Sequence, residues 1–323
     1  MSSTRCSGSN RRPPDAVIAP PRGDYALKVS SIVVLGSANM DLVVRQPRLP
    51  EPGETIFGSA YSAVPGGKGL NQAVAAARAG GDVAFVGAVG HDAFGAQLRA
   101  TLVADGIDVA RLVEVDVETG TAHIAVMDGG ENSIVVVPGA NAALTALSAD
   151  DTAPIERAGY LLAQFERPLD LVADALALAK RHGVTTVLTP APVQEVPAGL
   201  LELVDILVPN AIEARQLAGL ADEIAAALAL SAGRLVVMTR GGDGVLVARD
   251  GEVLHDLPAR RVEPVDTTGA GDTFTGVLVA RLSRGDDLPT ALAAAGVGAS
   301  ISVTRAGATT SMPEWAEIAA ALV

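Results

Sequence analysis

The stretch Asp266-Thr-Thr-Gly-Ala-Gly-Asp-Thr-Phe-Thr-Gly276 lies between an extended-looking segment, residues 261–265, and a run with helical periodicity, residues 274–282. Amide hydrogens in such a stretch are expected at a helix N-terminus, where unpaired donors and the helix dipole favour an anion. Three of its residues are small enough to let the backbone lie close to a ligand: Gly269, Ala270 and Gly271.

Asp272 follows directly after these three residues. A carboxylate beside an anion site suits a general base, which takes the proton from a hydroxyl group that attacks a phosphoryl group. The alternative is that Asp272 only caps the helix, as Asp often does. Taken alone, the stretch leaves both interpretations open.

Composition indicates a globular chain of one large or two modest domains. The 323 residues are 49% hydrophobic and 19% charged, with only 3% aromatic residues. The net charge is −13, and Lys and Arg cluster only in the N-terminal tail, so nucleic acid is not an expected partner. An anionic substrate must then be held by local donors and a metal.

Other classes of protein are also excluded. The single Cys6 permits no internal disulfide or Cys-based zinc site, and the four His residues show no metal-ligand spacing. The sequence has no run of 18 apolar residues and no apolar signal-peptide core, so no membrane association is expected and the cytoplasm is the expected location.

Short apolar runs alternate with helical segments along the chain, after a tail (residues 1–28) whose composition predicts disorder. This alternation predicts an α/β domain over residues 29–323 with a mainly parallel sheet, whose ligands bind at the carboxyl ends of the strands. The predicted strands are 31–36, 83–89, 160–165, 185–188, 205–208, 235–239 and 244–248. The predicted helices are 70–79, 93–104, 169–182, 222–231, 271–282 and 288–303.

Two stretches interrupt the alternation, within about residues 41–64 and 119–138. Both contain strand-like runs with no helix between them, and residues 128–132 are typical of a hairpin turn. We interpret them as a small accessory sheet that forms a lid over the strand ends and excludes water from the reaction.

Polar residues follow several predicted strands and are candidates for binding a small polar ligand. Asn39 and Asp41 would point to one side of an extended segment, where a diol could bind, or they form an ordinary strand-end turn. Glu166 ends its strand at the same edge of the sheet. A glycine-rich stretch either lets the backbone lie close to a polar ligand, with Lys and Asn as donors, or is only the glycine-rich start of a helix. Its residues are Gly66, Gly67, Lys68 and Asn71.

Two further motifs suit a nucleotide. Asn210 and Glu213 form a pattern typical of a capping box, or they lie near nucleotide phosphates and a hydrated Mg²⁺. The segment 239–244 is either a plain hairpin or a glycine-rich floor under a nucleotide.

Together these motifs resemble the ribokinase family of sugar and nucleoside kinases. The resemblance covers about residues 31–315 and is carried by Gly36-Ser-Ala-Asn-Met-Asp41, Pro52-Gly-Glu-Thr55, Gly66-Gly-Lys-Gly-Leu-Asn-Gln-Ala73 and Asp266–Gly276. It implies a ribokinase-like, doubly wound α/β fold with a β-sheet lid. Two positions depart from the usual pattern: Leu70, where Ala is common, and Gly296, where Asn or His is frequent.

The resemblance also implies a role for each candidate residue. Asp272 is then the general base, with Gly269, Ala270 and Gly271 as the anion hole. Sugar-binding residues would be Asn39, Asp41, Gly66, Gly67, Lys68, Asn71 and Glu166. ATP would contact Asn210, Thr239, Gly241, Gly242, Gly244 and Gly271, and Glu213 would hold Mg²⁺ through water. A K⁺ activator would lie at Asp266, Thr268, Ser302, Arg305, Gly307 and Ser311.

The implied reaction is ATP-dependent phosphorylation of D-ribose at O5, by a homodimer paired through its lids. A related kinase acting on deoxyribose, a nucleoside or a hexose, and a non-catalytic sugar or nucleotide sensor, are the alternatives.

Overall fold

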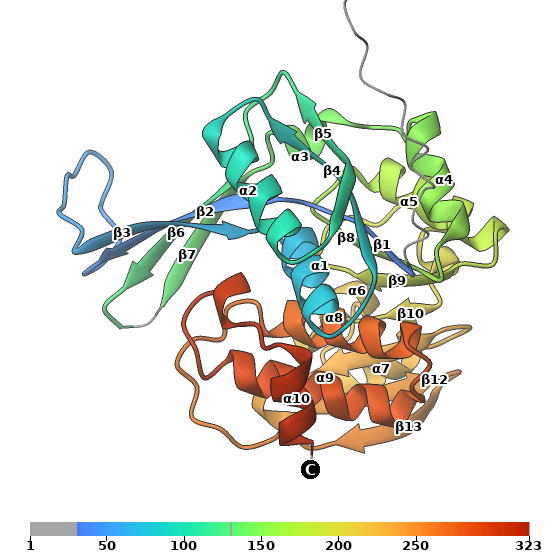
Figure 1. The fold of residues 1–323 in the computed structure, drawn as a ribbon. Helices are drawn as coiled ribbons and strands as arrows, with labels where there is room; N and C mark the ends of the chain where they lie inside the picture. The colour runs from blue at the N-terminus through green and yellow to red at the C-terminus, as the bar shows by residue number, and fades with distance from the viewer. Residues whose placement is uncertain (1–30, 130, 323) are drawn as a thin grey trace, which may run out of the picture.

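The computed structural model describes residues 31–129 and 131–322, so the predicted tail lies outside the described residues. A nine-stranded sheet runs through the body of the molecule with helices on both faces, and a separate four-stranded sheet projects from it as an arm (Figure 1). The α/β class and the mainly parallel sheet predicted from the sequence are therefore confirmed.

The nine strands lie in the order β13-β12-β11-β10-β9-β8-β1-β4-β5. Neighbours from β11 to β5 pair in parallel, while β12 and β13 pair antiparallel at one edge. Their bounds are β1 Ile32–Leu35, β4 Val83–Gly90, β5 Asp108–Val115, β8 Tyr160–Gln164, β9 Thr185–Thr189, β10 Ile206–Leu207, β11 Leu235–Thr239, β12 Val245–Arg249 and β13 Glu252–Leu257.

The helices form two layers, one over each face of this sheet (Figure 1). One layer contains α1 Lys68–Arg78, α2 Ala93–Ala104, α8 Ala270–Ser283, α9 Leu288–Ser302 and α10 Trp315–Ala321. The other contains α4 Ala149–Arg157, α5 Leu169–Arg181, α6 Ala211–Ala218 and α7 Glu223–Leu230. The short α3, Ala140–Ala143, follows the arm, and three single turns of 3-10 helix are η1 Leu201–Leu203, η2 Gly241–Asp243 and η3 Thr309–Ser311.

Alternation along the strands divides the core into two clusters. In β1, Ile32 and Val34 face the first helical layer, while Val33 and Leu35 face the second. All four side chains are fully buried, which explains why the strand reads as a continuous apolar run. Burying each such side chain stabilises the fold by roughly 1.5–3 kcal/mol.

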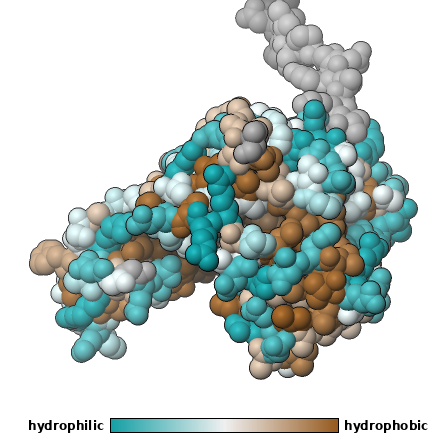
Figure 2. All heavy atoms as spheres, turned by 90° about the horizontal axis from the view of Figure 1, so that it is seen from below, coloured by the Kyte–Doolittle hydropathy of each residue, from teal (hydrophilic) through white to brown (hydrophobic). Residues whose placement is uncertain are grey.

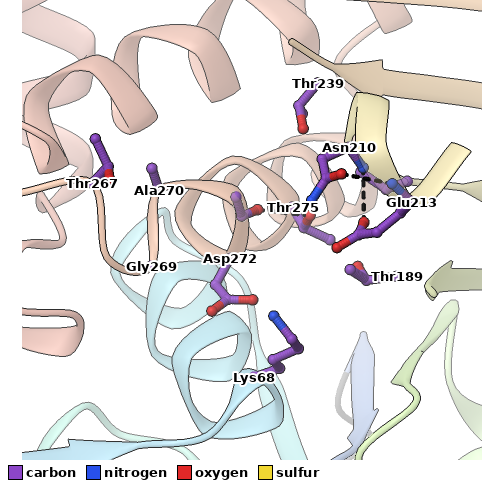
Figure 3. Close-up of a pocket in the computed structure, with 12 residues that line it drawn as sticks. Lys68, Thr189, Asn210, Glu213, Thr239, Thr267, Gly269, Ala270, Asp272 and Thr275 are labelled. Atoms are coloured by element: carbon purple, nitrogen blue, oxygen red, sulfur yellow. Dashed lines mark hydrogen bonds between the residues drawn. The ribbon is translucent and has the colours of Figure 1, made fainter. Parts of the chain in front are cut away.

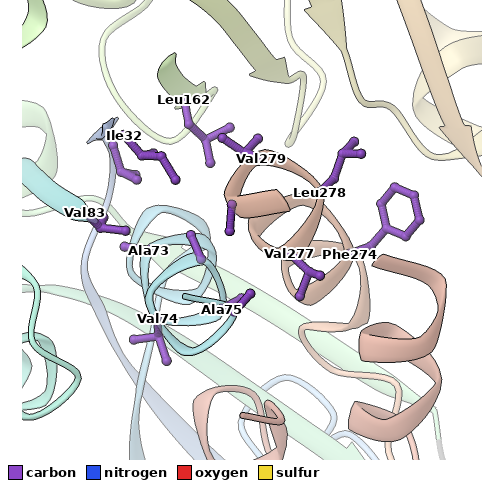
Figure 4. Close-up of a cluster of buried hydrophobic side chains, with 14 of the residues drawn as sticks. Ile32, Ala73, Val74, Ala75, Val83, Leu162, Phe274, Val277, Leu278 and Val279 are labelled. Atoms are coloured by element: carbon purple, nitrogen blue, oxygen red, sulfur yellow. The ribbon is translucent and has the colours of Figure 1, made fainter. Parts of the chain in front are cut away.

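The contact between α1 and α8 brings the two most informative motifs together (Figure 4). A Cβ on Gly276 would lie 2.5 Å from the carbonyl oxygen of Gln72 and 2.6 Å from the Cβ of Ala75. Only glycine in α8 therefore allows this close crossing. Phe274 and Val277 of α8 are buried in the same cluster and hold the helix in place.

The arm is the accessory sheet expected from the sequence. It contains β2 Asn39–Gln46, β3 Ala60–Gly66, β6 Gly120–Met127 and β7 Asn132–Val137, in the order β3-β2-β6-β7. Antiparallel pairing of β6 with β7 confirms a hairpin connection between them. The segment 261–265, which looked extended, forms no strand.

The predicted elements omit the strands β5 and β13 and the helices α3, α4 and α10, and of α6 the sequence indicated only the capping pattern at its start. β5 carries Arg111 and Glu114 because it lies at the edge of the sheet, where one side faces solvent. β13 is half exposed at the opposite edge. In α4 the internal Pro154 argues against a helix in the sequence pattern, although the Ser148–Asp151 capping box caps its first turn.

Candidate active site

One pocket collects residues from both halves of the chain at the carboxyl ends of the strands (Figure 3). Its volume is about 180 Å³. The lining residues are Lys68, Thr189, Val208, Asn210, Glu213, Thr239, Thr267, Gly269, Ala270, Gly271, Asp272 and Thr275. The predicted base, anion hole, capping-box pair and Lys68 therefore share one cavity.

The N-terminus of α8 opens onto this pocket. Gly269 is its N-cap residue in the left-handed region, with φ of 73°, and no side chain caps the helix. The carboxylate of Asp272 instead accepts hydrogen bonds from Asn71 Nδ2 at 3.1 Å and from Gln72 Nε2 at 2.9 Å. These contacts exclude the interpretation of Asp272 as a helix cap.

Lys68, the first residue of α1, points toward Asp272 across the pocket (Figure 3). Burial alone would lower the pKa of Lys68, but the surrounding carboxylates outweigh it and hold the pKa above its usual value. Those carboxylates belong to Asp272, Glu166, Glu213 and Asp41. One ammonium among four carboxylates leaves the site strongly acidic.

A second pocket of about 350 Å³ adjoins the arm. Its lining residues include Asn39, Val136, Pro138, Asn141, Phe165, Glu166 and Arg167. Asn39 is 2% exposed, and its Oδ1 accepts a hydrogen bond from Asn141 Nδ2 at 2.7 Å. Asn141 in turn is tied to the backbone of Ala38 in both directions, so it fixes the orientation of Asn39.

Glu166 is held from one side by the start of α1. Its Oε2 accepts hydrogen bonds from Ser37 Oγ and from the backbone amide of Lys68, the latter at 3.0 Å. Gly69 approaches so closely that a Cβ on it would lie 2.4 Å from the Cα of Gly36. The glycine-rich stretch thus packs against the end of β1, where the amide of Lys68 donates to Glu166 and the amide of Gly69 donates to Ser37 Oγ.

Asp41 lies on the arm, with its carboxylate against the end of β3. A Cβ on Gly66 would lie only 2.1 Å from Asp41 Oδ2, so any side chain at this position would displace the Asp41 carboxylate. Burial, together with the negative charges of Glu166 and Asp272, raises the pKa of Asp41 to about 7. Gly67, with φ of 90°, follows where a Cβ would meet the backbone nitrogen of Asn39 at 2.8 Å.

The predicted nucleotide residues are only partly brought together. Asn210 and Glu213 form the capping box at the start of α6, with both bonds at 2.8 Å, and both still line the first pocket. In the hairpin after β11, Thr239 lines that pocket but the glycines do not. Gly244 has a packing role, because a Cβ there would lie 2.0 Å from the carbonyl oxygen of Leu257.

The residues predicted to hold a monovalent cation fall into two groups. Asp266 accepts hydrogen bonds from Thr268 and from the backbone amide of Gly307, which joins two distant loops. Burial opposes ionisation, but these bonds hold the pKa of Asp266 below its usual value. The side chains of the other three are engaged elsewhere: Ser302 with Ala299, Ser311 with Ala308, and Arg305 with Glu317.

Sequence patterns missed several residues of the site. Gln72, Gln164 and Asn141 are fully or almost fully buried and reach the predicted residues through hydrogen bonds. Gln72 is adjacent to Asn71 in the glycine-rich motif, so a polar side chain among buried alanines was the available signal. Leu70, which departs from the family pattern, lies in the hydrophobic core.

No group of three or more His, Cys, Asp or Glu that could hold a metal ion is found within residues 31–129 and 131–322. Over the same residues, none of the helices has both the length and the apolar character that a membrane span requires.

Comparison with known proteins agrees with this geometry. Residues 29–315 match the pfkB family of carbohydrate kinases, and the chain belongs to that family. It is 41% identical over 292 residues to the ribokinase of Haemophilus influenzae, covering 88% of this chain and 95% of that protein. It is likewise 41% identical over 291 residues to the ribokinase of Bacillus subtilis, covering 89% and 98%.

Solved structures show the same fold. The Arabidopsis thaliana ribokinase, determined in complex with ribose and ATP, superposes with a TM-score of 0.84 at 32% identity, covering 91% of this chain and 99% of that one. The Thermotoga maritima ribokinase gives a TM-score of 0.83 at 33% identity, covering 90% and 98%. The ribokinase-like fold, with its small second sheet, is therefore confirmed.

Proposed function

We propose that this protein is a ribokinase, which transfers the γ-phosphoryl group of ATP to O5 of D-ribose. The observation that carries the proposal is the position of Asp272, a buried residue in the first turn of α8, which shares a pocket with Gly269, Ala270 and Gly271 at the N-terminus of that helix. The identity with ribokinases over almost the whole chain supports ribose as the sugar.

In the proposed reaction, Asp272 accepts the proton of the sugar hydroxyl as its oxygen attacks phosphorus. The amides of Gly269, Ala270 and Gly271 stabilise the negative charge that develops on the transferred group. Lys68 lies in the same pocket, so we assign its ammonium to the phosphates rather than to the sugar.

The second pocket suits the sugar. Asn39 and Glu166 line it, and Asp41 lies near Glu166 on the arm above. Asn71 lies beside the base, because its Nδ2 donates to Asp272 while its Oδ1 is buried with no partner among the described residues. A sugar hydroxyl that donates to this oxygen would satisfy it and would stand next to the base.

The first pocket suits a nucleotide phosphate chain with Mg²⁺. Four carboxylates around one ammonium would repel a polyanion, so a divalent cation is needed to neutralise it. Glu213 is the carboxylate beside the predicted phosphate contacts, Asn210 and Thr239. Mg²⁺ keeps several waters in such sites and would be held by Glu213 through them.

A K⁺ activator is proposed at the junction of the loops around Asp266 and Gly307. The Asp266 carboxylate joins these loops next to the N-terminus of α8, and a cation there would stabilise the anion hole. Asp266→Ala should remove the stimulation of turnover by K⁺ without changing ribose affinity; undiminished stimulation would place the cation elsewhere.

The decisive experiment is ADP release by the purified protein with Mg-ATP over a panel of ribose, deoxyribose, nucleosides and hexoses, with and without K⁺. Asp272→Asn should lower kcat by about 10²–10⁴-fold and leave ribose affinity intact. Asp222→Asn, a helix N-cap remote from the pocket, is the matched control for loss of one carboxylate. Binding of ribose without ADP release would indicate a sensor, and turnover on another substrate would indicate a related kinase.

We propose further that two copies pair through their arms. β7 lies at the edge of the arm sheet, and its side chains 134–137 are 45–62% exposed although all are Ile or Val. Figure 2 shows apolar residues gathered along the projecting arm. An exposed apolar edge strand is a pairing surface. Val135→Lys should convert a dimer to a monomer in analytical ultracentrifugation; an unchanged mass would disprove this interface.

A further inference from the structure

Gln72 is a fully buried side chain next to the proposed base, in the middle of α1. Its neighbours along the helix are buried alanines and a valine. An amide in such surroundings is costly unless its polar atoms are hydrogen-bonded. The partners that satisfy it therefore indicate what the side chain does.

All the polar atoms of Gln72 are engaged. Its Nε2 donates to Asp272 Oδ1 at 2.9 Å and to Thr189 Oγ1 at 3.3 Å, and its Oε1 accepts from Gln164 Nε2 at 2.7 Å. An NH₂ group carries two hydrogens, so both donations can exist together.

The Asp272 carboxylate, which can only accept, sets which way the Gln72 amide points, and Gln164 at the end of β8 supports this orientation by donating to Gln72 Oε1. If the amide of Gln72 were reversed, its oxygen would face the Asp272 carboxylate and its NH₂ would face the NH₂ of Gln164. Both contacts would be repulsive. The surroundings therefore favour the orientation in which the NH₂ group of Gln72 donates to Asp272. Gln164 is itself fully buried and cannot turn toward solvent.

Two amides hold the carboxylate, and they differ in how completely their own polar atoms are paired. Asn71 donates to Oδ2 at 3.1 Å, but its own oxygen has no partner and is the group proposed to meet the sugar. Gln72 is tied behind the site to strands β8 and β9 and faces neither pocket. Rotation of an Asp carboxylate about χ2 is soft, so a fixed second anchor decides its orientation.

We propose that Gln72 is a positioning residue, which, held by Gln164, keeps the Asp272 carboxylate turned toward the acceptor hydroxyl. The proposal rests on the function of Asp272 as the base. A misplacement of about 1 Å in a reacting group can lower the rate by roughly 10²-fold, so loss of the anchor should appear in kcat.

The test uses Gln72→Met, which keeps the volume and removes the donors. We expect kcat to fall by about 10- to 100-fold while KM for ribose and for ATP changes little. Gln164→Met should give a smaller fall of the same kind. In an Asp272→Asn background Gln72→Met should cause no further loss, because the group that it positions is already absent.

Thr186→Val is the matched control. Thr186 is also fully buried and hydrogen-bonded, to Asp205 and Leu203, but it lies at the far end of β9 from the pocket. This variant should lower the melting temperature and leave kcat unchanged.

A kcat for Gln72→Met within twofold of the wild type, with Asp272→Asn inactive, would overturn the role of Gln72 and leave the proposed function standing. A further fall in the Asp272→Asn background would also overturn it. Substantial turnover by Asp272→Asn would instead overturn the proposed function. Should Gln72→Met not fold, Gln164→Met provides the same comparison, and an unchanged kcat there would refute the proposal.

Discussion

Asp41→Asn should make the protein more stable at pH 8 while weakening ribose binding. Asp41 is 9% exposed, so its carboxylate is largely removed from water. Burial and the charges of Glu166 and Asp272 raise its pKa from 3.8 to about 7. The native protein therefore keeps a proton on Asp41 that the unfolded chain releases near pH 4.

The direction in which stability changes with pH follows from the proton that Asp41 binds. Because the native state binds this proton more tightly, the stability that Asp41 contributes is fully present below pH 3.8 and is lost as pH rises to about 7. Each pKa unit corresponds to about 1.4 kcal/mol, so the loss is about 4 kcal/mol. At an unfolding entropy of about 2.1 cal/mol/K per residue, this is roughly 6 °C in melting temperature.

The assay is differential scanning calorimetry of both proteins from pH 4.5 to 8. The melting temperature of the variant should exceed that of the wild type increasingly as pH rises, and the difference should level off above pH 7. Glu166→Gln should shift the midpoint of this dependence to lower pH, because it removes one of the charges that raise the pKa of Asp41. A difference that is the same at pH 4.5 and pH 8 would refute the reasoning.

Asp41→Asn should weaken ribose binding at pH 8, although it stabilises the fold at that pH. An ionised carboxylate accepts a hydroxyl hydrogen bond more strongly than an amide does, so Asp41→Asn should cost about 1.5–3 kcal/mol of ribose binding at pH 8. In the wild type, affinity should weaken as pH falls below 7. Isothermal titration with ribose measures both effects, and pH-independent affinity would contradict the contact.

Three further variants test other features of the structure. Arg167→Met should raise the free energy of unfolding by about 1–3 kcal/mol in urea titration, because its guanidinium is 4% exposed, its Nε and Nη1 have no partner among the described residues, and burial lowers its pKa to about 10. Gly66→Ala should raise the dissociation constant for ribose by at least about tenfold, since its Cβ would displace the Asp41 carboxylate. Phe274→Ala should lower the free energy of unfolding by about 3–5 kcal/mol, because Phe274 is 2% exposed in the core.

Much of the fold, and the proposal of Asp272 as the base, could be derived from the sequence. Continuous apolar runs between helices identified most strands of the parallel sheet, because strands buried on both faces consist mainly of apolar residues. The stretch Asp266–Gly276 indicated an anion site because the first amides of a helix have no partner within the helix and small residues let a ligand come close to them. In the structure Asp272 lies in the first turn of that helix. Burial of a strand and the start of a helix depend on residues close together in the sequence, so a short stretch of sequence is enough to predict them.

Contacts between distant segments could not be predicted in this way. Gln72 and Asp272 are 200 positions apart, and only the close crossing of α1 and α8 at Gly276 brings them within hydrogen-bonding distance. The raised pKa of Asp41 likewise depends on burial and on the charges of Glu166 and Asp272, which lie far from it in the sequence. Sequence determined which residues can do the chemistry, and tertiary packing decided which of them meet, because distance and desolvation exist only in the folded chain.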